Sequence, residues 1–316
     1  MRDPYARCRL CPRRCGADRG VLKQGFCGET AEIRIAAASL HHGEEPPVSG
    51  RGGSGTIFFT GCGLGCSFCQ NAQISRQGLG RVVGRAEFAA LCLALQERGA
   101  ENLNLVTGSH CVPALADFLR GAREQGLAIP ILWNSSSYEN PEALALVEDL
   151  VDVYLPDLKT LDPALAGRFF NAPDYPEAAE KAILRMLDRR GKLRWRGPVL
   201  VSGVMVRHLV LPGCAESTRQ ALRWFADHCK GRALLSLMTQ YTPVGPAGLI
   251  PKGSVSRSGY DRLVEWLDEF GIEDGFCQEP VPGSGWLPDF ERINPFSSEL
   301  SVPVWHWKTG LLPREL

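Results

Sequence analysis

Three cysteines stand close together in one glycine-rich segment, residues 61–71, where Cys62, Cys66 and Cys69 have the spacing C-x3-C-x2-C. An apolar run at residues 56–59 precedes them and predicts a buried strand, so we expect the thiols on a loop just past its C-terminal end. The glycines allow turns tight enough for the sulfurs to converge. Zinc sites usually have four protein ligands, whereas three thiolates on one loop suit a four-iron cluster with one open iron. The pattern favours iron–sulfur chemistry, with zinc as the alternative.

Phe68, just before the last cysteine, completes the resemblance of this segment to the cluster-binding motif of the radical S-adenosylmethionine (SAM) superfamily. Within that superfamily, the ending Cys69-Gln70-Asn71 and several later segments are similar to the pyruvate formate-lyase activating enzymes, in a branch with an extra N-terminal cysteine set. The similarity runs from Cys8 to about Phe290. It implies an α/β fold, a partial (β/α)6 TIM-like barrel whose site lies at the C-terminal ends of the strands.

The resemblance also implies a function. A [4Fe–4S] cluster on the three cysteines binds SAM through its open iron, and reductive cleavage of SAM gives a 5′-deoxyadenosyl radical that abstracts hydrogen. For an activating enzyme, the substrate is a backbone glycine of a partner enzyme, and a flavodoxin or ferredoxin supplies the electron. Two alternatives stay open: a radical SAM reaction on another peptide or a small molecule, and a non-catalytic module that binds zinc or an iron–sulfur cluster.

A second cysteine set lies nearer the N-terminus, with the spacing C-x2-C-x3-C-x11-C, and consists of Cys8, Cys11, Cys15 and Cys27. This segment has few apolar residues and cannot build a core of its own, so a bound metal would supply the missing stability. Four thiols at these distances fit either a structural zinc or an auxiliary iron–sulfur cluster.

Strands and helices alternate from residue 54 through about six β/α units, which predicts parallel strands with covering helices. We expect strands at 56–59, 102–107, 129–133, 151–158, 199–211 and 233–238, and helices at 85–98, 113–125, from 140, from 174, and at 217–228. The chain then divides into a Cys-rich N-terminal extension (1–50), a radical SAM partial barrel (51–275) and an irregular C-terminal extension (276–316) that packs on the barrel.

Polar residues that follow the predicted strands are the candidate cofactor contacts. Radical SAM enzymes usually have Gly-Gly-Glu-Pro after the second strand, whereas this chain has Thr107-Gly108-Ser109-His110. Because the methionine amino group is held there by backbone carbonyls, Thr107 and Gly108 remain candidates. By position, Asn134 and Ser136 look like cofactor contacts, although serines are also common in turns. The resemblance assigns the adenine to the backbone around Phe68.

Two charged pairs on predicted strands carry more information. Residues two apart on a strand face the same way, so Asp157 and Lys159 point into the barrel together, where an unpaired charge would be costly. The resemblance places Lys159 on the SAM carboxylate and Asp157 near it or on a monovalent cation; a structural salt bridge is the alternative. Arg207 and His208 must face opposite ways, and the resemblance favours Arg207 on the SAM side.

The composition limits the partners. The 316 residues carry 35 basic and 35 acidic side chains, and this balance argues against a general nucleic-acid-binding protein, although residues 189–196 are locally basic around Trp195. Neither a run of eighteen apolar residues nor an apolar signal core is present, so we expect a cytoplasmic protein without membrane contact. In that compartment the twelve cysteines predict metal ligation rather than disulfides.

Overall fold

One large sheet organises the fold. The computed structural model describes residues 3–21, 24–245, 248, 250–280 and 285–314, so parts of both predicted extensions lie outside the described residues. The strands are β1 (Arg34–His41), β2 (Ser54–Phe59), β3 (Arg81–Val82), β4 (Leu103–Val106), β5 (Ile131–Ser135), β6 (Val153–Pro156), β7 (Arg194–Arg196), β8 (Val199–Leu209), β9 (Leu234–Met238), β10 (Gly275–Cys277), β11 (Ser301–His306) and β12 (Gly310–Leu311).

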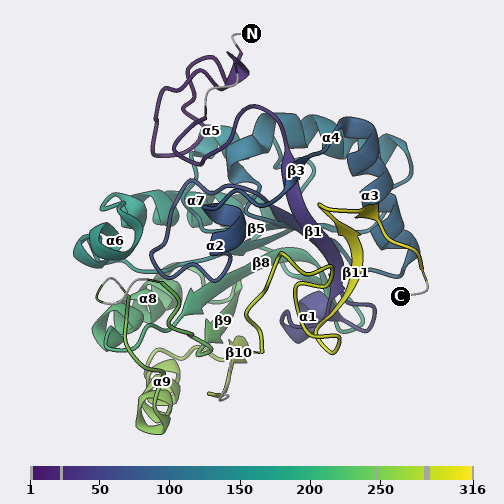
Figure 1. Ribbon diagram of the computed structural model, residues 1–316. Helices are drawn as coiled ribbons and strands as arrows, with labels where there is room; N and C mark the ends of the chain where they lie inside the picture. The colour runs from purple at the N-terminus through teal and green to yellow at the C-terminus, as the bar shows by residue number, and fades with distance from the viewer. Residues whose placement is uncertain (1–2, 22–23, 246–247, 249, 281–284, 315–316) are drawn as a thin grey trace.

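Their order across the sheet is β10-β9-β8-β6-β5-β4-β2-β1-β11-β12. All pairs from β2 to β10 are parallel, and β1, β11 and β12 continue the sheet in antiparallel pairing. Strand β3 pairs with β1, and β7 forms a hairpin with β8. The sheet ends at β10 and β12 without closing, which confirms the predicted partial barrel (Figure 1).

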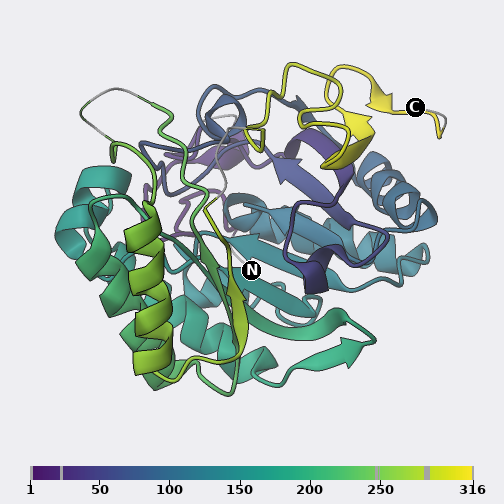
Figure 2. The same cartoon turned by 90° about the horizontal axis from the view of Figure 1, so that it is seen from below.

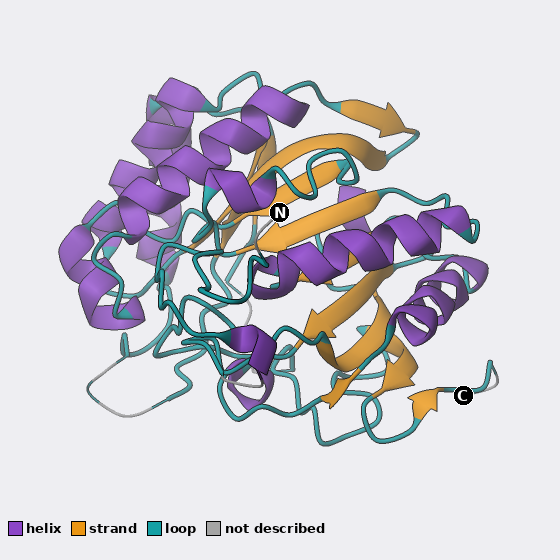
Figure 3. Cartoon of the chain, turned by 90° about the horizontal axis from the view of Figure 1, so that it is seen from above, coloured by secondary structure: helices purple, strands orange, loops and turns teal. Residues whose placement is uncertain are grey.

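Helices flank the strands, as Figure 3 shows. They are α1 (Pro46–Ser49), α2 (Ala72–Ser75), α3 (Arg85–Glu97), α4 (Val112–Glu124), α5 (Pro141–Leu144), α6 (Pro163–Phe170), α7 (Tyr175–Arg190), α8 (Ala215–His228) and α9 (Arg257–Glu269), with single 3-10 turns at η1 (Arg19–Val21) and η2 (Ser109–Cys111). None of the helices in the described part of the chain has both the length and the hydropathy needed to cross a bilayer.

Alternation along the parallel strands separates an outer from an inner face. On the outer face, Trp133 of β5 and Tyr154 of β6 join the large core beneath the helices. On the inner face, Leu132 and Val153 belong to a smaller cluster that also contains Val48 of α1. The short helix α1 therefore fills the interior of the partial barrel near the N-terminal ends of the strands.

The C-terminal tail is more regular than predicted, because β11 and β12 extend the sheet beyond β1. Figure 2 shows this yellow edge on the side of the molecule opposite α9. Phe290 and Phe296 pack with Phe58 of β2 in a third cluster, with ring centroids 5.3 and 5.6 Å from that of Phe58. The tail thus covers the inner face of β2 with aromatic side chains.

Neither of the helices predicted to begin near residues 140 and 174 is capped by the side chain of its first residue. Asp174 precedes α7 as expected, but its carboxylate accepts a hydrogen bond from the Tyr138 hydroxyl at 2.9 Å instead of capping the helix. Asn140 precedes only the single turn of α5, and its side-chain amide donates to the Arg9 carbonyl at 2.8 Å. In both cases a tertiary partner competes with the local helix N-terminus, which a local pattern cannot reveal.

Candidate functional site

The Cys62 loop leaves β2 at its C-terminal end, as predicted. Gly61 has φ +88°, and a Cβ there would lie 2.9 Å from the carbonyl of Cys27, so this position requires glycine. The Phe68 ring is buried, with centroids 5.6 Å from Tyr241 and 5.9 Å from Phe169. This aromatic packing fixes the loop against the barrel rim.

All three loop cysteines are free thiols, and each is partly buried. The amide of Leu64 donates to Cys62 Sγ at 3.4 Å, and the Ser75 hydroxyl donates to Cys69 Sγ at 3.3 Å. Within the described residues, no three His, Cys, Asp or Glu side chains are arranged around a single ion. A cluster needs a wider arrangement, because each thiolate binds its own iron. Three free thiols on one loop fit a [4Fe–4S] cluster in which each would bind a separate iron and one iron would stay open.

Electrostatics also favour a cationic group at this loop. Burial raises the pKa of the Cys66 thiol, Lys159 opposes this shift, and Cys69 and Cys62 add to it. Burial likewise raises the pKa of Cys69, partly offset by the hydrogen bond from Ser75. Neighbouring thiols that resist ionisation without a cation are suited to ligands that lose their protons when iron binds.

Lys159 lies beside this loop at the end of β6. Its ammonium is 2.6 Å from the Asp157 carboxylate, and both side chains are about one-fifth exposed, at 19% and 21%. Tyr175 of α7 fixes the turn, because its hydroxyl donates to the Asp157 carbonyl and accepts from the Lys159 amide. Burial would lower the pKa of Lys159, but Asp157 and Cys66 outweigh burial and raise it. A permanent positive charge therefore faces the thiols.

The ends of β4 and β5 contribute polar groups at the same edge of the sheet. Thr107 has φ +63°, and its amide donates to the Asn134 carbonyl at 2.9 Å. Asn134 and Ser136 are partly accessible, whereas Ser135 points the other way and donates to the buried Glu139. Asn134 and Ser136 thus alternate with the inaccessible Ser135, and the Thr107 backbone is bonded to that of Asn134.

Arg207 and His208 do face opposite sides. Arg207 points inward, where its Nη2 is 2.6 Å from Glu44 and also contacts Glu45. His208 points outward: Nδ1 lies 2.6 Å from the Leu158 carbonyl, and Nε2 lies 3.0 Å from the Thr218 hydroxyl. The inward direction predicted for Arg207 is confirmed, and His208 is a structural residue under α8.

His110, which follows the end of β4, is buried, and its Nδ1 has no hydrogen-bond partner among the described residues. Burial, with the nearby Arg19, lowers the pKa of His110 to about 3. A buried imidazole with so low a pKa stays neutral at physiological pH.

Some residues at the site contact partners that are far away in the sequence, and these contacts were not predicted. Glu44 and Glu45 are adjacent, and adjacent residues diverge on regular elements, but here they belong to a loop and both reach Arg207. Arg13 donates to the carbonyls of Gly63 at 3.1 Å and Leu64 at 2.7 Å. The sequence marks Glu44 and Glu45 as possible ligands or proton donors but does not indicate Arg207 as their partner, and no local signal points to Arg13.

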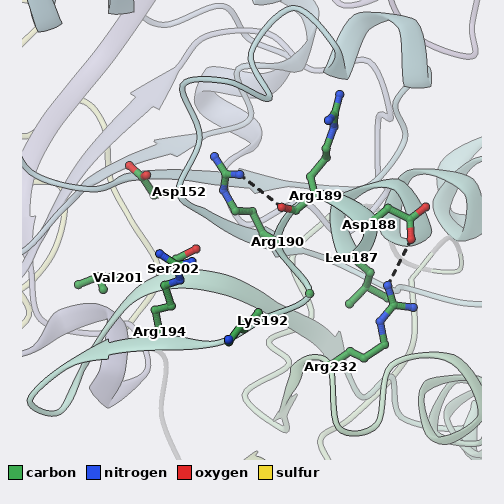
Figure 4. A pocket seen from close by; sticks show the side chains of 11 residues that line it. Asp152, Leu187, Asp188, Arg189, Arg190, Lys192, Arg194, Val201, Ser202 and Arg232 are labelled. Atoms are coloured by element: carbon green, nitrogen blue, oxygen red, sulfur yellow. Dashed lines mark hydrogen bonds and ion pairs between the residues drawn. The ribbon is translucent and has the colours of Figure 1, made fainter.

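A cavity of about 670 Å³ lies elsewhere, among basic side chains that include Arg189, Arg190, Lys192 and Arg194 (Figure 4). Its other walls are Asp152, just before β6, and Ser202, early in β8, so it borders the N-terminal ends of the strands. Because the thiols lie at the opposite ends, this cavity is separate from the candidate site.

Comparisons with known proteins agree with this arrangement. A family model described as the radical SAM superfamily matches residues 56–218, more than half of the chain. The uncharacterized protein MJ0674 of Methanocaldococcus jannaschii is 27% identical over 245 residues, which cover 76% of this chain and 67% of that protein.

Two solved structures share the fold. SuiB of Streptococcus suis, bound to its precursor peptide SuiA, has a TM-score of 0.50 at 13% identity, covering 69% of this chain and 46% of SuiB. A radical SAM methyltransferase from Sphaerobacter thermophilus has a TM-score of 0.50 at 18% identity, covering 71% of this chain and 65% of that one. The match thus spans about half the length of SuiB, and at these identities the likeness concerns the fold alone. The extent of the family match, by contrast, shows that the chain belongs to the radical SAM superfamily.

Proposed function

We propose that this protein cleaves SAM reductively and activates a glycyl-radical enzyme by removing hydrogen from a backbone glycine. Cys62, Cys66 and Cys69 would hold a [4Fe–4S] cluster, which together with SAM supplies the radical chemistry. Support for the activating role comes from Cys69-Gln70-Asn71 and from the Asp157-x-Lys159 pattern, both similar to activating enzymes. The proposed electron donor is a flavodoxin or ferredoxin.

The observation that carries the SAM site is the position of Lys159 beside Cys66. An ammonium held by Asp157 at 2.6 Å is pre-positioned for the carboxylate of SAM, so little side-chain freedom is lost on binding. Because Cys66 and Lys159 interact electrostatically, a ligand bound by both would span the thiol loop and β6. A charge-assisted hydrogen bond of this kind contributes about 1.5–3 kcal/mol.

We assign the other SAM contacts by their place at the mouth. The partly accessible Asn134 and Ser136 suit the ribose or carboxylate, and the backbone of Thr107 and Gly108 suits the amino group. The backbone beside Phe68 would meet the adenine. These side chains end neighbouring parallel strands, where barrel enzymes bind their ligands.

Arg207 adds a further polar group to the proposed SAM site from the inner face of β8. Its Nη2 is held by Glu44 and Glu45, whereas its buried Nε has no hydrogen-bond partner among the described residues. A buried donor without an acceptor is costly, so an oxygen supplied by a bound ligand or water would relieve that cost.

Lys159→Met tests the SAM site. In the anaerobically reconstituted protein, we expect SAM affinity to fall at least about tenfold, the lower end of what a lost charge-assisted hydrogen bond costs. Lys181→Met is the matched control, because Lys181 is 61% exposed and pairs only with Glu177 on the surface of α7. Equal affinities for wild type, variant and control, measured by calorimetry, would exclude Lys159 as a SAM contact.

The activating role needs a second experiment. The reduced protein is incubated with SAM and with glycyl-radical enzymes from the same organism, and each partner is examined by electron paramagnetic resonance. We expect a doublet from a glycyl radical on one of them. SAM cleavage without a doublet on any partner would instead favour the alternative, a radical reaction on another peptide or a small molecule. A zinc-only protein without SAM cleavage would support a non-catalytic binding module.

A further inference from the structure

The four N-terminal thiols gather in space although they span twenty residues. The Cys8 amide donates to the Ala17 carbonyl and the Gly16 amide to the Cys8 carbonyl, both at 3.0 Å, so residues 8–17 form a closed loop. That loop brings Cys15 into hydrogen-bonding contact with Cys8. A Cβ on Gly25 would lie 3.4 Å from Cys27 Sγ and 3.5 Å from Cys15 Sγ. The sulfurs therefore border one small region.

A buried cation supports this region. Arg19 is 1% exposed, and its guanidinium donates to the carbonyls of Glu29 and His110 and to Cys8 Sγ at 3.5 Å. Arg19 therefore connects the loop of Cys8 to the segment at Glu29 and to the 3-10 turn η2. These contacts hold the cysteine segment in a fixed position against the barrel.

The same region touches the Cys62 loop directly. The Cys62 amide donates to the Cys27 carbonyl at 3.3 Å, and a Cβ on Gly63 would lie 3.3 Å from Cys11 Sγ. Arg13 adds its hydrogen bonds to the carbonyls of Gly63 and Leu64. Ligand loops of the two cysteine sets are therefore in backbone contact, although they are far apart in the chain (Figure 1).

We propose that Cys8, Cys11, Cys15 and Cys27 bind a second iron–sulfur cluster, seated against the loop of the radical SAM cluster. A single zinc ion would draw its four sulfurs to within about 4 Å of one another, since each Zn–S bond is about 2.3 Å long. A four-iron cluster would hold the four sulfurs farther apart, because each would bind a different iron. A redox centre is also the group that gains from contact with another cluster's loop.

Metal analysis of cysteine variants tests this inference. The inference rests on the proposed function in one respect, the [4Fe–4S] cluster on Cys62, Cys66 and Cys69. The wild type is reconstituted anaerobically beside a triple variant, Cys62→Ala with Cys66→Ala and Cys69→Ala, and a Cys11→Ser variant. We expect about eight irons in the wild type and about four, without zinc, in the triple variant. Cys214→Ser is the matched control, because Cys214 is a half-buried thiol outside both sets, and should retain the wild-type iron.

The possible outcomes distinguish a failure of this inference from a failure of the proposed function. One zinc and no iron in the triple variant would overturn the proposal, and so would a triple variant that folds but holds no metal. Four irons in the triple variant, together with a wild type that cannot cleave SAM, would leave this inference standing while the proposed function failed. Folding is checked by circular dichroism, and Cys11→Ser gives a milder lesion that should lower the iron content while sparing the Cys62 site.

A spectroscopic readout tests the contact between the two loops. The reduced wild type should show an electron paramagnetic resonance spectrum broadened by interaction between two neighbouring paramagnets. Spectra of the triple variant and of Cys11→Ser provide the separate components. A wild-type spectrum equal to their simple sum would contradict the placement of the second cluster against the Cys62 loop.

Discussion

The ion pairs inside the barrel give a prediction with a defined size. Arg207 is 7% exposed at its side chain, and its partners Glu44 and Glu45 are 14% and 10% exposed. Burial would raise the pKa of Glu45, but Arg207 and a hydrogen bond from Ser236 lower it, so the carboxylate stays ionised. The inner face therefore holds two carboxylates that share one guanidinium.

Arg207→Met removes the cation and leaves both carboxylates without it. Breaking a buried ion pair from one side costs about 3–5 kcal/mol, because the remaining charge is uncompensated. We expect a loss of that size in the free energy of unfolding of the metal-free protein, measured by urea denaturation at pH 7 without SAM. Arg219→Met is the control: its pair with Glu269 is 37% and 45% exposed, so a loss below about 1 kcal/mol is expected.

A second variant, Arg207→Met combined with Glu44→Gln and Glu45→Gln, identifies the cause of the lost stability. If unpaired charge is what destabilises Arg207→Met, then adding Glu44→Gln and Glu45→Gln should restore much of the lost stability, since neutral amides cost far less to bury. If the triple variant is no more stable than Arg207→Met alone, the loss comes from packing of the long arginine side chain. A loss under about 1 kcal/mol in Arg207→Met itself would refute the description of this network as buried and ionised.

Two further predictions concern single side chains. Burial lowers the pKa of His208 to about 4, so between pH 6.5 and 4 the unfolded chain binds a proton that the native state does not. His208 should contribute about 3 kcal/mol to the fall in the free energy of unfolding across that window, with His110 adding a further fall, and His208→Gln should remove only the His208 share. Arg13→Ala should cost about 1–3 kcal/mol and speed hydrogen exchange at amides 61–65, because its hydrogen bonds to Gly63 and Leu64 are lost. The exposed Arg9→Ala is its control; equal exchange in both variants would contradict the role given to Arg13.

Apolar runs were sufficient to predict the parallel strands. The observed β2, β4, β5, β6, β8 and β9 each fall within or close to the expected ranges, because strands covered by helices on one face and packed on the other are continuously apolar. Helices α6 and α9 were missed, although Asp162-Pro163 and Ser256 are ordinary N-terminal signals and both side chains do cap. The sequence therefore contains local N-terminal signals for both helices.

The interior of the barrel could not be predicted in the same way. The pairing of Arg207 with Glu44 joins residues 163 positions apart, and it exists only because β1 runs antiparallel to β2 and returns α1 into the interior. Local patterns give the direction of each side chain from its strand, which is why the inward placement of Asp157 and Arg207 was predictable. They do not give the element that supplies the opposite charge.

Apolar and charged side chains occupy different parts of the barrel interior. Nearest the N-terminal ends of the strands, Val48 of α1 packs against apolar side chains, so water is excluded there. Farther along the strands, Arg207 with its two glutamates lies beside Asp157, its bridge partner on the neighbouring strand, and Lys159 pairs with Asp157 near Cys66. Because Asp157 also helps to raise the pKa of Arg207, the two ion-pair groups are electrostatically coupled. A change in the glutamates should therefore alter the electrostatics at Lys159 and the position of Arg207 together, and SAM affinity in Glu44→Gln would report their combined effect on the proposed SAM site.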